Sequence, residues 1–267
     1  MSSKSVLITG CSLGGIGHAL ALSFQQRGFT VFATARSTKK MSDLVSLPNV
    51  HLLSLDVASP SSIQAAMKEI DAQTGGKLDV LVNNAGAQFI MPGLDVDIDV
   101  AKEHFDINYW GPLRMMQAFA EMLVAAKGCV VNVASVAAVT NLPFQSQYAA
   151  SKAAITSLSE SMRIELAPLK VRVITVMAGS VQSKIFDNNP GPAKLPPTSF
   201  YRSIEGLIPV TPKFNETPAK TFTDDIVADV LRSATGKVWH ADGANIIRYV
   251  VPFMPQWLFV GSKKTFL

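Results

Sequence analysis

The chain contains little cysteine and little charge. Cys11 and Cys129 are the only cysteines among its 267 residues, which excludes a disulfide framework and a cysteine-rich zinc site. Charged residues make up 16% of the sequence and hydrophobic residues 48%, so the chain is not intrinsically disordered. Its net charge of +4 comes without basic clusters. We therefore expect no nucleic-acid partner, and an anionic small ligand fits the charge better.

Long hydrophobic runs are also missing. The first apolar stretch, residues 5–9, is shorter than the core of an export signal. The apolar and aromatic run 246–260 is interrupted by Arg248 and two prolines, and it is shorter than the roughly 20 residues that a membrane-spanning helix needs. We expect a cytoplasmic protein whose tail, about residues 244–267, covers the core or lies on a membrane surface.

Short β-branched or apolar runs alternate with helical patterns through most of the chain. The expected strands are residues 6–9, 30–34, 51–55, 80–82, 129–134 and 171–177. The expected helices are 15–27, 61–73, 100–127 with a break near Asn108, and 147–167. Several strands are apolar throughout, which is typical of a parallel sheet covered on both faces. The pattern predicts a single α/β domain with a doubly wound, Rossmann-type parallel sheet.

Proline concentrates between residues 188 and 218, a stretch that cannot form a long regular element. Long loops inside compact domains are usually lids or disordered segments. Apolar side chains that can pack over a site occur in and beside it: Phe186, Phe200, Tyr201, Leu207 and Ile208. We predict a substrate-covering lid at about residues 184–218.

A glycine-rich turn, residues 9–17, joins the first predicted strand to the first predicted helix. It contains the candidate phosphate-binding residues Gly10, Ser12, Gly15, Ile16 and Gly17. Such a turn lets backbone N–H groups approach a pyrophosphate, and the helix N-terminus favours the negative charge. The alternative is a tight turn without a ligand. Its position at the first strand of an alternating pattern favours a dinucleotide site.

The second predicted strand ends in Ala35-Arg36. A site that prefers NAD would carry Asp or Glu there to hold the ribose 2′-hydroxyl. No carboxylate opposes a 2′-phosphate here, and the guanidinium of Arg36 can bind one through two hydrogen bonds. A lone surface arginine is the alternative, but the missing acid favours NADPH/NADP+ as the cofactor.

Tyr148 and Lys152 lie at i and i+4, so they share one face of a predicted helix. A nearby ammonium favours phenolate, and we expect Lys152 to lower the pKa of Tyr148 from its ordinary value of about 10. Tyr148 then exchanges a proton with a carbonyl or alcohol near neutral pH. Ser135, at the end of the predicted strand 129–134, can hydrogen-bond the same substrate oxygen. A solvated helix face is the alternative for the Tyr/Lys pair alone.

Together these residues resemble the short-chain dehydrogenase/reductase family over about residues 5–185. Ser135 lies 13 residues before Tyr148 and 27 after Asn108, which is the family's spacing. The family's motifs also occur in its order: the glycine-rich turn, Asn83-Asn84-Ala85-Gly86, Asn108, Ser135, and Tyr148 with Lys152.

The resemblance implies a role for each catalytic candidate. Tyr148 would be the general acid in reduction, and Ser135 would orient and polarise the carbonyl. Lys152 would hold the nicotinamide ribose and tune Tyr148. Asn108 would position a water that continues the proton relay from Lys152.

The resemblance also implies further cofactor contacts. Asp56, followed by Val57, would contact the adenine, and Asn83, Ala85 and Gly86 would line the cofactor. The alternatives are a capping role for Asp56 and turn-forming roles for the asparagines.

Two features depart from the family's pattern. The run Gly14-Gly15-Ile16-Gly17 has one extra residue before the final glycine. After the sixth predicted strand the family usually has Pro-Gly before a Thr that binds the carboxamide, but this chain has Ala178-Gly179-Ser180-Val181-Gln182-Ser183. Ser183 can supply the hydroxyl and Val181 the backbone group. The missing proline leaves the stiffness of the loop open.

The doubled glycine and Ala33-Thr34-Ala35-Arg36 are similar to a narrower branch, the fungal NADPH-dependent acyl-dihydroxyacetone-phosphate reductases. That likeness implies a lipophilic carbonyl substrate and peripheral contact with the endoplasmic reticulum or lipid droplets. Related reductases serve polyketide, terpenoid and steroid pathways, so the substrate stays open. Family members are commonly homodimers or homotetramers, which implies a homo-oligomer.

Two other classes of function remain as alternatives. The run Gly10-Cys11-Ser12-Leu13-Gly14 also spells the nucleophile elbow of an ester hydrolase, but no histidine has a supporting context. A non-catalytic nucleotide sensor predicts the loss of a catalytic side chain, whereas all four are present. His and Cys show no metal-ligand spacing, so we expect no metal. We predict NADPH-dependent reduction of a ketone or aldehyde to an alcohol.

Overall fold

One parallel sheet of seven strands runs through the computed structural model, which describes residues 3–140, 142–185, 194–208 and 215–255. The strands are β1 (Ser5–Thr9), β2 (Thr30–Ala35), β3 (Val50–Ser54), β4 (Val80–Asn83), β5 (Cys129–Val133), β6 (Arg172–Ala178) and β7 (Gly236–His240). Their order is β3-β2-β1-β4-β5-β6-β7, and all neighbouring pairs are parallel. The predicted doubly wound parallel sheet is confirmed. Its order reverses between β1 and β4, where sheets of this kind bind ligands at the carboxyl ends of the strands.

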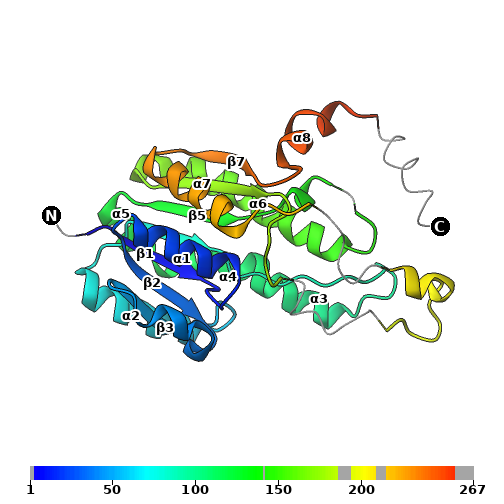
Figure 1. Cartoon of the computed structure of the whole chain (residues 1–267), viewed down its shortest axis with the longest axis horizontal. Helices are drawn as coiled ribbons and strands as arrows, with labels where there is room; N and C mark the ends of the chain where they lie inside the picture. Colours follow the sequence, from blue (N-terminus) through cyan, green and yellow to red (C-terminus); the bar gives the residue numbers. More distant parts are fainter. Residues whose placement is uncertain (1–2, 141, 186–193, 209–214, 256–267) are drawn as a thin grey trace.

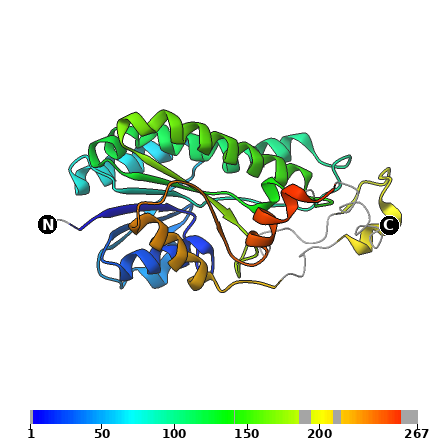
Figure 2. The same cartoon turned by 90° about the horizontal axis from the view of Figure 1, so that it is seen from above.

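Helices cover both faces of the sheet, as Figure 2 shows from above. On one face lie α1 (Ile16–Gln26) and α7 (Ala219–Leu231), which contact each other along their length. On the other face lie α2 (Pro60–Thr74), α4 (Gly111–Ala118), α5 (Ala120–Ala126) and the long α6 (Ser146–Leu166). The sheet is therefore the middle one of three layers (Figures 1 and 2).

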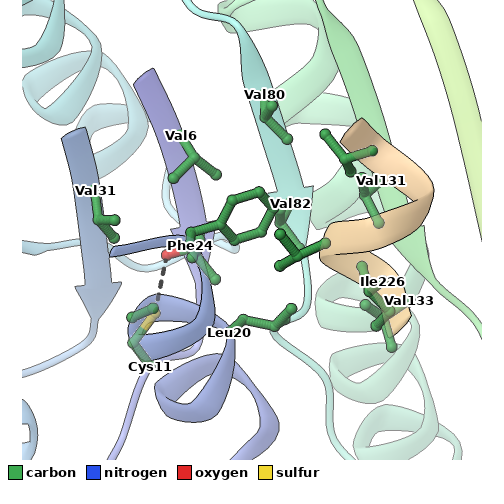
Figure 3. Packing of buried hydrophobic residues seen from close by; sticks show 14 of the residues in the cluster. Val6, Cys11, Leu20, Phe24, Val31, Val80, Val82, Val131, Val133 and Ile226 are labelled. Atoms are coloured by element: carbon green, nitrogen blue, oxygen red, sulfur yellow. Dashed lines mark hydrogen bonds between the residues drawn. The ribbon is translucent and has the colours of Figure 1, made fainter. Parts of the chain in front are cut away.

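The face covered by α1 and α7 shows why these segments are helical and buried. Figure 3 shows Leu20 and Phe24 of α1 pointing onto Val6 and Val82 of the sheet, beside Ile226 of α7. Phe24 is 0% exposed. Replacing such a side chain with alanine costs about 3–5 kcal/mol, because the cavity left behind does not collapse completely. This packing fixes the glycine-rich turn that precedes α1.

The predicted break near Asn108 is a π-helical turn. After α3 (Ile98–Phe105), which begins at the capping carboxylate of Asp97, residues Asp106–Trp110 form this wider turn before α4. Single π turns inside helices are frequent at functional sites. The wider turn places Asn108 in the interior, where it is 2% exposed.

The helices and the strand between residues 219 and 253 were not predicted from the sequence. They are α7, β7, α8 (Ala244–Tyr249) and a short 3-10 turn, Val251–Phe253. A 3-10 segment, Thr38–Leu44, also follows β2. No helix of the described residues is both long enough and apolar enough to cross a bilayer.

Part of the predicted lid packs on the loop that follows β4. Residues 194–208 include the 3-10 segment Arg202–Leu207, and they lie at the same end of the molecule as α3 (Figure 1). Leu195 and Ile208 pack on Ile90, with Tyr201 at their edge. The expectation that Phe200 and Leu207 also pack is wrong, because they are 87% and 67% exposed. Phe186 lies outside the described residues.

Candidate active site

A cavity of about 730 Å³ opens at the carboxyl ends of the strands. Residues that end or follow each of the seven strands line it, and α6 contributes Tyr148 and Lys152. Its volume is typical of a site for a small molecule or cofactor. The predicted cofactor-binding residues that line it are Gly10, Ser12, Gly15, Ile16, Arg36, Asp56, Val57, Ala85, Gly86, Tyr148, Lys152, Val181 and Ser183.

The glycine-rich turn is shaped by close backbone contacts. Gly10 has φ +76°, and a Cβ on it would lie 2.9 Å from Cα of Ala85. The amide of Asn84 donates to the carbonyls of Thr9 (2.8 Å) and Gly10 (3.2 Å), which joins this turn to the one after β4. Helix α1 begins beyond Gly15 without a side-chain cap. The turn therefore leaves an uncapped helix N-terminus at the cavity wall, which fits a pyrophosphate.

Gly17 and Asn83 are not among the described residues that line the cavity, so contact of these two residues with the cofactor stays a prediction. A Cβ on Gly17 would lie 2.4 Å from the carbonyl oxygen of Gly10, so Gly17 serves the packing of α1 on β1. Asn83 is the last residue of β4 and is 4% exposed, and its amide donates to Oδ1 of Asn132 at 2.8 Å. The neighbouring residue Asn84 faces the cavity instead.

Basic residues gather at the end of the cavity next to β2. Arg36 lies there as predicted, and Lys39, Lys40 and Ser42 of the following 3-10 segment line the same wall. The N–H of Leu13 donates to the carbonyl of Lys40 at 2.8 Å, which ties this segment to the glycine-rich turn. Three cations with no carboxylate of β2 beside them suit a phosphate ester. The sequence contained this signal, since two lysines follow Arg36 closely.

Asp56 contributes both to the cavity wall and to a turn. It lines the cavity, while its Oδ1 accepts the N–H of Ala58 at 3.0 Å. The capping alternative is wrong, because the residue that caps α2 is Ser59, whose side chain accepts the N–H of Ser62. A carboxylate has a second oxygen to offer, and contact of Asp56 with the adenine stays a prediction. Val57, Ala85 and Gly86 present backbone and small side chains to the same wall.

Tyr148 and Ser135 converge in the middle of the cavity. Tyr148 is 9% exposed, and burial raises its pKa to about 12 against the opposing effect of a hydrogen bond with Ser135. Ser135 follows β5, and its Oγ accepts the N–H of Ala137 at 3.1 Å. The expected lowering of the Tyr148 pKa is wrong, because burial outweighs nearby groups. A phenol that keeps its proton at neutral pH is suited to donating it.

Lys152 is also buried, at 5% exposure, one helical turn after Tyr148. Its ammonium donates to the carbonyl of Val133 at 2.9 Å and lies 5.8 Å from the centre of the Tyr148 ring. Burial lowers the pKa of Lys152 to about 8, since desolvation disfavours the charged form. The group is therefore mostly charged at neutral pH and loses its charge in mildly alkaline solution.

Asn108 holds the active-site loops together. Its Oδ1 accepts the N–H of Ala87 at 2.8 Å, and its Nδ2 donates to the carbonyl of Ala87 at 2.8 Å and to Oγ of Ser151 at 3.0 Å. Both amide hydrogens are therefore used. A water at Asn108 must bind the remaining lone pair of Oδ1 or the backbone.

The loop after β6 is stiff although it lacks the proline of the family's pattern. The N–H of Ser180 donates to the carbonyl of Asp242 at 3.1 Å, and Ser180 accepts the N–H of Thr217 at 3.0 Å. Gln182 in turn donates to the carbonyl of Thr217 at 3.0 Å. These bonds fix the segment from both sides. They present Val181 and Ser183 to the cavity, as predicted.

The other end of the cavity is lined by residues that the sequence did not single out. They are Gln88, Thr140, Leu142, Gln145, Ile185, Asp242, Gly243 and Ile247. Gln88 and Gln145 are joined by a hydrogen bond of 3.3 Å. Most of these side chains are neutral, and they come from loops and from α8, whose sequences follow no shared motif.

The arrangement does not suit a hydrolase. No histidine lines the cavity within the described residues. His18 pairs with Asp43 at 2.5 Å and His240 with Asp229 at 2.6 Å. Within the same residues, no group of three or more His, Cys, Asp or Glu side chains is placed so that it could hold a metal ion.

The chain is similar to known proteins in both sequence and fold. The family model described as "short chain dehydrogenase" matches residues 4–191. "Short-chain dehydrogenase PC-15" of Penicillium crustosum is 45% identical over 262 residues, which cover 97% of this chain and 96% of that protein. An "NADPH-dependent 1-acyldihydroxyacetone phosphate reductase" of Schizosaccharomyces pombe is 43% identical over 77% of this chain and 70% of its own length. The crystal structure of a short chain dehydrogenase from Burkholderia cenocepacia in complex with NADP has a TM-score of 0.78, 26% identity and 97% coverage of both chains.

Proposed function

Because the chain belongs to the short-chain dehydrogenase family, an oxidoreductase family, we propose that it uses NADPH to reduce a ketone or aldehyde to an alcohol. The observation that carries the proposal is the meeting of Tyr148, Ser135 and Lys152 in one cavity with the glycine-rich turn. The name of the Schizosaccharomyces pombe relative and the NADP complex of the Burkholderia neighbour support the choice of cofactor. So do the three cations Arg36, Lys39 and Lys40.

Different residues of the cavity bind different parts of the cofactor. Gly10, Gly15 and the N-terminus of α1 hold the pyrophosphate, and Arg36 with its neighbouring lysines holds the 2′-phosphate. When bound, NADPH supplies the hydride. Val181 and Ser183 present a backbone group and a hydroxyl to the carboxamide from the stiffened loop after β6.

The remaining residues bind the substrate carbonyl and transfer a proton to it. Ser135 donates a hydrogen bond to the substrate carbonyl and fixes it beside Tyr148. Tyr148, which its raised pKa keeps protonated, gives its proton to the carbonyl oxygen. Lys152 offsets the negative charge left on the phenolate and binds the ribose. Asn108 positions the loop at Ala87 and the helix at Ser151, and it holds the relay water through its free lone pair or its backbone.

A direct test follows the nicotinamide absorbance of purified protein with NADPH and a panel of ketones and aldehydes. We expect carbonyl-dependent loss of NADPH and no cleavage of esters in its absence. Ester cleavage without cofactor, or tight NADPH binding with no turnover of any carbonyl, would support the hydrolase or the sensor instead.

For the substrate, we propose a lipophilic carbonyl compound. Leu142, Ile185 and Ile247 give the substrate end apolar surface. Exposed apolar side chains continue along the segment after β7: Ile246, Tyr249, Val250 and Phe253. They lie on α8 and on the 3-10 turn after it, and this exposed apolar stripe supports the proposed contact with a lipid surface. Residues 256–267 of the tail lie outside the described part of the chain.

Two substrate classes fit a lipophilic site. Acyl-dihydroxyacetone phosphate carries a dianionic phosphate, whereas ketones of secondary metabolism are mostly neutral. Among the eight residues named above for the substrate end, the one charged side chain is the carboxylate of Asp242, which repels a phosphate. This observation favours a neutral ketone as the second candidate.

A matched pair of substrates separates the two classes. 1-Acyl-dihydroxyacetone phosphate and its dephosphorylated analogue share the carbonyl and the acyl chain. If the substrate is neutral, kcat/KM is higher for the dephosphorylated compound. A preference for the phosphate ester would point to acyl-dihydroxyacetone phosphate.

We further propose that the chain forms a single domain in which residues 184–218 cover the substrate. The proposal is supported by Lys184 and Ile185 in the cavity wall and by the packing of Leu195 and Ile208 on Ile90. A homodimer or homotetramer remains part of the proposal. Sedimentation of the purified chain tests it.

A further inference from the structure

Two buried glutamines lie in the wall of the cavity at its substrate end. Gln88 is 8% exposed and Gln145 is 6% exposed, and both line the cavity. The side-chain amide of Gln88 donates to Oε1 of Gln145 at 3.3 Å. Glutamine is mostly found at protein surfaces, because a buried amide costs free energy unless it is hydrogen-bonded. Apolar side chains close a cavity at no such cost, so closing the wall does not account for two amides there.

Both glutamines are held by the backbone next to them. Gln88 follows Ala87, whose N–H and carbonyl are both bonded to the side chain of Asn108, each at 2.8 Å. Gln145 directly precedes α6, and its carbonyl accepts the N–H of Ala149 at 2.8 Å. The two amides therefore start from fixed positions in the cavity wall.

The segments that carry the two glutamines are also joined to each other. The N–H of Met91 donates to the carbonyl of Phe144 at 2.8 Å. Phe144 has φ +64°, which is uncommon for a residue with a side chain, and its ring packs edge-on against that of Tyr201, with 6.2 Å between the centroids. Strained backbone of this kind persists only where the surrounding structure fixes it, and it is concentrated at functional sites. The amides of Gln88 and Gln145 are thus presented from a preorganised wall.

The amide pair lies close to the proton donor along the chain. Gln145 stands three residues before Tyr148, which is the third residue of α6. The residue that precedes a helix and the third residue of that helix are neighbours. Both side chains also line the cavity. A substrate whose carbonyl lies at Tyr148 and Ser135 therefore places its adjoining atoms beside the glutamines.

The pair offers donors and acceptors without a net charge. Each glutamine has two N–H donors and a carbonyl oxygen that accepts two hydrogen bonds. The bond between the two amides uses one donor of Gln88 and one lone pair of Gln145, so each amide has capacity for more than this bond. A hydroxyl group both donates and accepts, so it matches the pair whichever way each amide is turned. The carboxylate of Asp242 at the same end disfavours an anion in that place.

We propose that Gln88 and Gln145 bind a hydroxyl group that the substrate carries close to the carbonyl to be reduced, so that the substrate is a lipophilic hydroxy ketone or hydroxy aldehyde. The inference rests on the proposed function, since it takes the reacting carbonyl to lie at Tyr148 and Ser135. The apolar surface of the substrate end binds the rest of the molecule. The amide pair selects which part of it lies next to the carbonyl.

Two pairs of ketones that differ by one hydroxyl test the proposal. 1-Acyl-dihydroxyacetone has a hydroxyl next to the carbonyl, and 1-acyloxyacetone has a hydrogen in its place. 4-Hydroxy-1-tetralone and 1-tetralone differ in the same way at the far side of a ring. In at least one pair we expect the native chain to reduce the hydroxy compound with a kcat/KM about 10- to 100-fold higher, because a site built to bond a hydroxyl rejects the analogue that lacks it.

Gln88→Met and Gln145→Met remove the amide and nearly keep the volume and flexibility of the side chain. We expect each to lower the preference for the hydroxy compound by about tenfold, with kcat/KM for its partner and the dissociation constant of NADPH unchanged. The comparison with the native chain cancels the greater electrophilicity that a neighbouring hydroxyl gives a carbonyl. Gln147→Met is the matched control, since Gln147 belongs to the same helix and is not among the described residues that line the cavity.

The outcomes separate this inference from the proposed function. If the native chain reduces no carbonyl compound with NADPH, the proposed function fails. If it reduces ketones but favours the hydroxy member of neither pair, the hydroxyl site is wrong while the function stands. A preference that survives in Gln88→Met and Gln145→Met also overturns the inference, as does an equal loss of kcat/KM for both members of a pair, because the amides then only support the wall.

A phosphate at this place is a further outcome that overturns the inference. It is shown if the native chain prefers 1-acyl-dihydroxyacetone phosphate over 1-acyl-dihydroxyacetone and both glutamine variants abolish that preference. The amide pair then binds an anion rather than a hydroxyl.

Discussion

The two ends of the active-site cavity are built differently. The cofactor end is made of the segments after β1 to β4, where the side-chain amide of Asn84 donates to the carbonyl of Gly10 and Arg36, Lys39 and Lys40 lie along one wall. The substrate end is made of longer loops and α8, and its lining is mostly neutral. The apolar stripe beside it, from Ile246 to Phe253, is exposed rather than buried.

The difference fits what we propose that each end binds, a dinucleotide at one and a lipophilic carbonyl compound at the other. A dinucleotide has invariant phosphates, so its site needs fixed N–H groups and cations, which short turns on a rigid sheet supply. A lipophilic carbonyl compound offers little but shape and apolar surface. Its site is therefore set by side chains on loops, where sequence varies most. Tyr148 and Ser135 lie where the two ends meet.

The largest expected effect lies at that meeting point. Ser135→Ala removes the hydroxyl that orients the carbonyl, and we expect turnover to fall by about 10²-fold or more with the NADPH dissociation constant unchanged. Ser157→Ala, an exposed serine on α6, is the control. Steady-state turnover and fluorescence titration on the same preparations check this. Full activity of Ser135→Ala would remove it from the proposed mechanism.

The next largest effect is expected on cofactor binding, from a substitution at the cofactor end. Arg36→Asp replaces a phosphate-binding cation with a carboxylate that repels the 2′-phosphate and can hold a ribose hydroxyl. We expect NADPH binding to weaken by about 10- to 100-fold and binding of NADH to improve. Lys68→Asp, with the same charge change on the exposed side of α2, leaves the ratio unchanged. An unaltered cofactor ratio in Arg36→Asp would contradict the assignment.

The pH dependence of kcat/KM tests whether the charge of Lys152 is needed where the two ends of the cavity meet. Burial lowers the pKa of Lys152 to about 8 and raises that of Tyr148 to about 12. As the pH rises, Lys152 therefore loses its charge first, while Tyr148 keeps its proton. We expect kcat/KM for NADPH to be level near neutral pH and to fall about tenfold per unit above about pH 8. A level profile up to about pH 10 would show that the charge of Lys152 is not needed.

The smallest effect is predicted for the substrate end. Ile247→Ala removes apolar surface from the cavity, so we expect KM for a lipophilic ketone to rise about fivefold with no change in NADPH binding. Ile246→Ala is the matched control, because Ile246 is the next residue but is 65% exposed and does not line the cavity. Equal effects of the two variants would count against this boundary of the site.

The contrast between the two ends also explains what could be predicted from the sequence. The strands β1 to β6 are apolar and alternate regularly with helices. Each motif of the cofactor end lies within a short stretch of the sequence. Strand β7 was missed because it lies at the edge of the sheet, with Lys237 exposed and Trp239 and His240 half-buried, so it lacks a continuous apolar run. Helix α7 carried a usable signal, since Phe222, Ile226 and Val230 repeat every four residues.

The differences between the expected and the observed environments of the site residues have a geometric cause. Neighbouring residues at the end of a strand point to opposite sides, so a motif such as Asn83-Asn84 does not reveal which amide faces the ligand. In the structure Asn83 faces Asn132, and Asn84 faces the cavity. The pKa of Tyr148 likewise depends on burial, which spacing alone does not reveal. Substrate-end residues such as Ile247 come from distant segments and share no motif.

The central claim is that a buried, protonated Tyr148 delivers a proton at the junction of the two ends. The most direct measurement compares NADPH binding and carbonyl-dependent NADPH oxidation in one preparation of Tyr148→Phe. The account predicts a dissociation constant within about twofold of the native value and turnover at least about 10²-fold lower. Turnover equal to that of the native chain would contradict it.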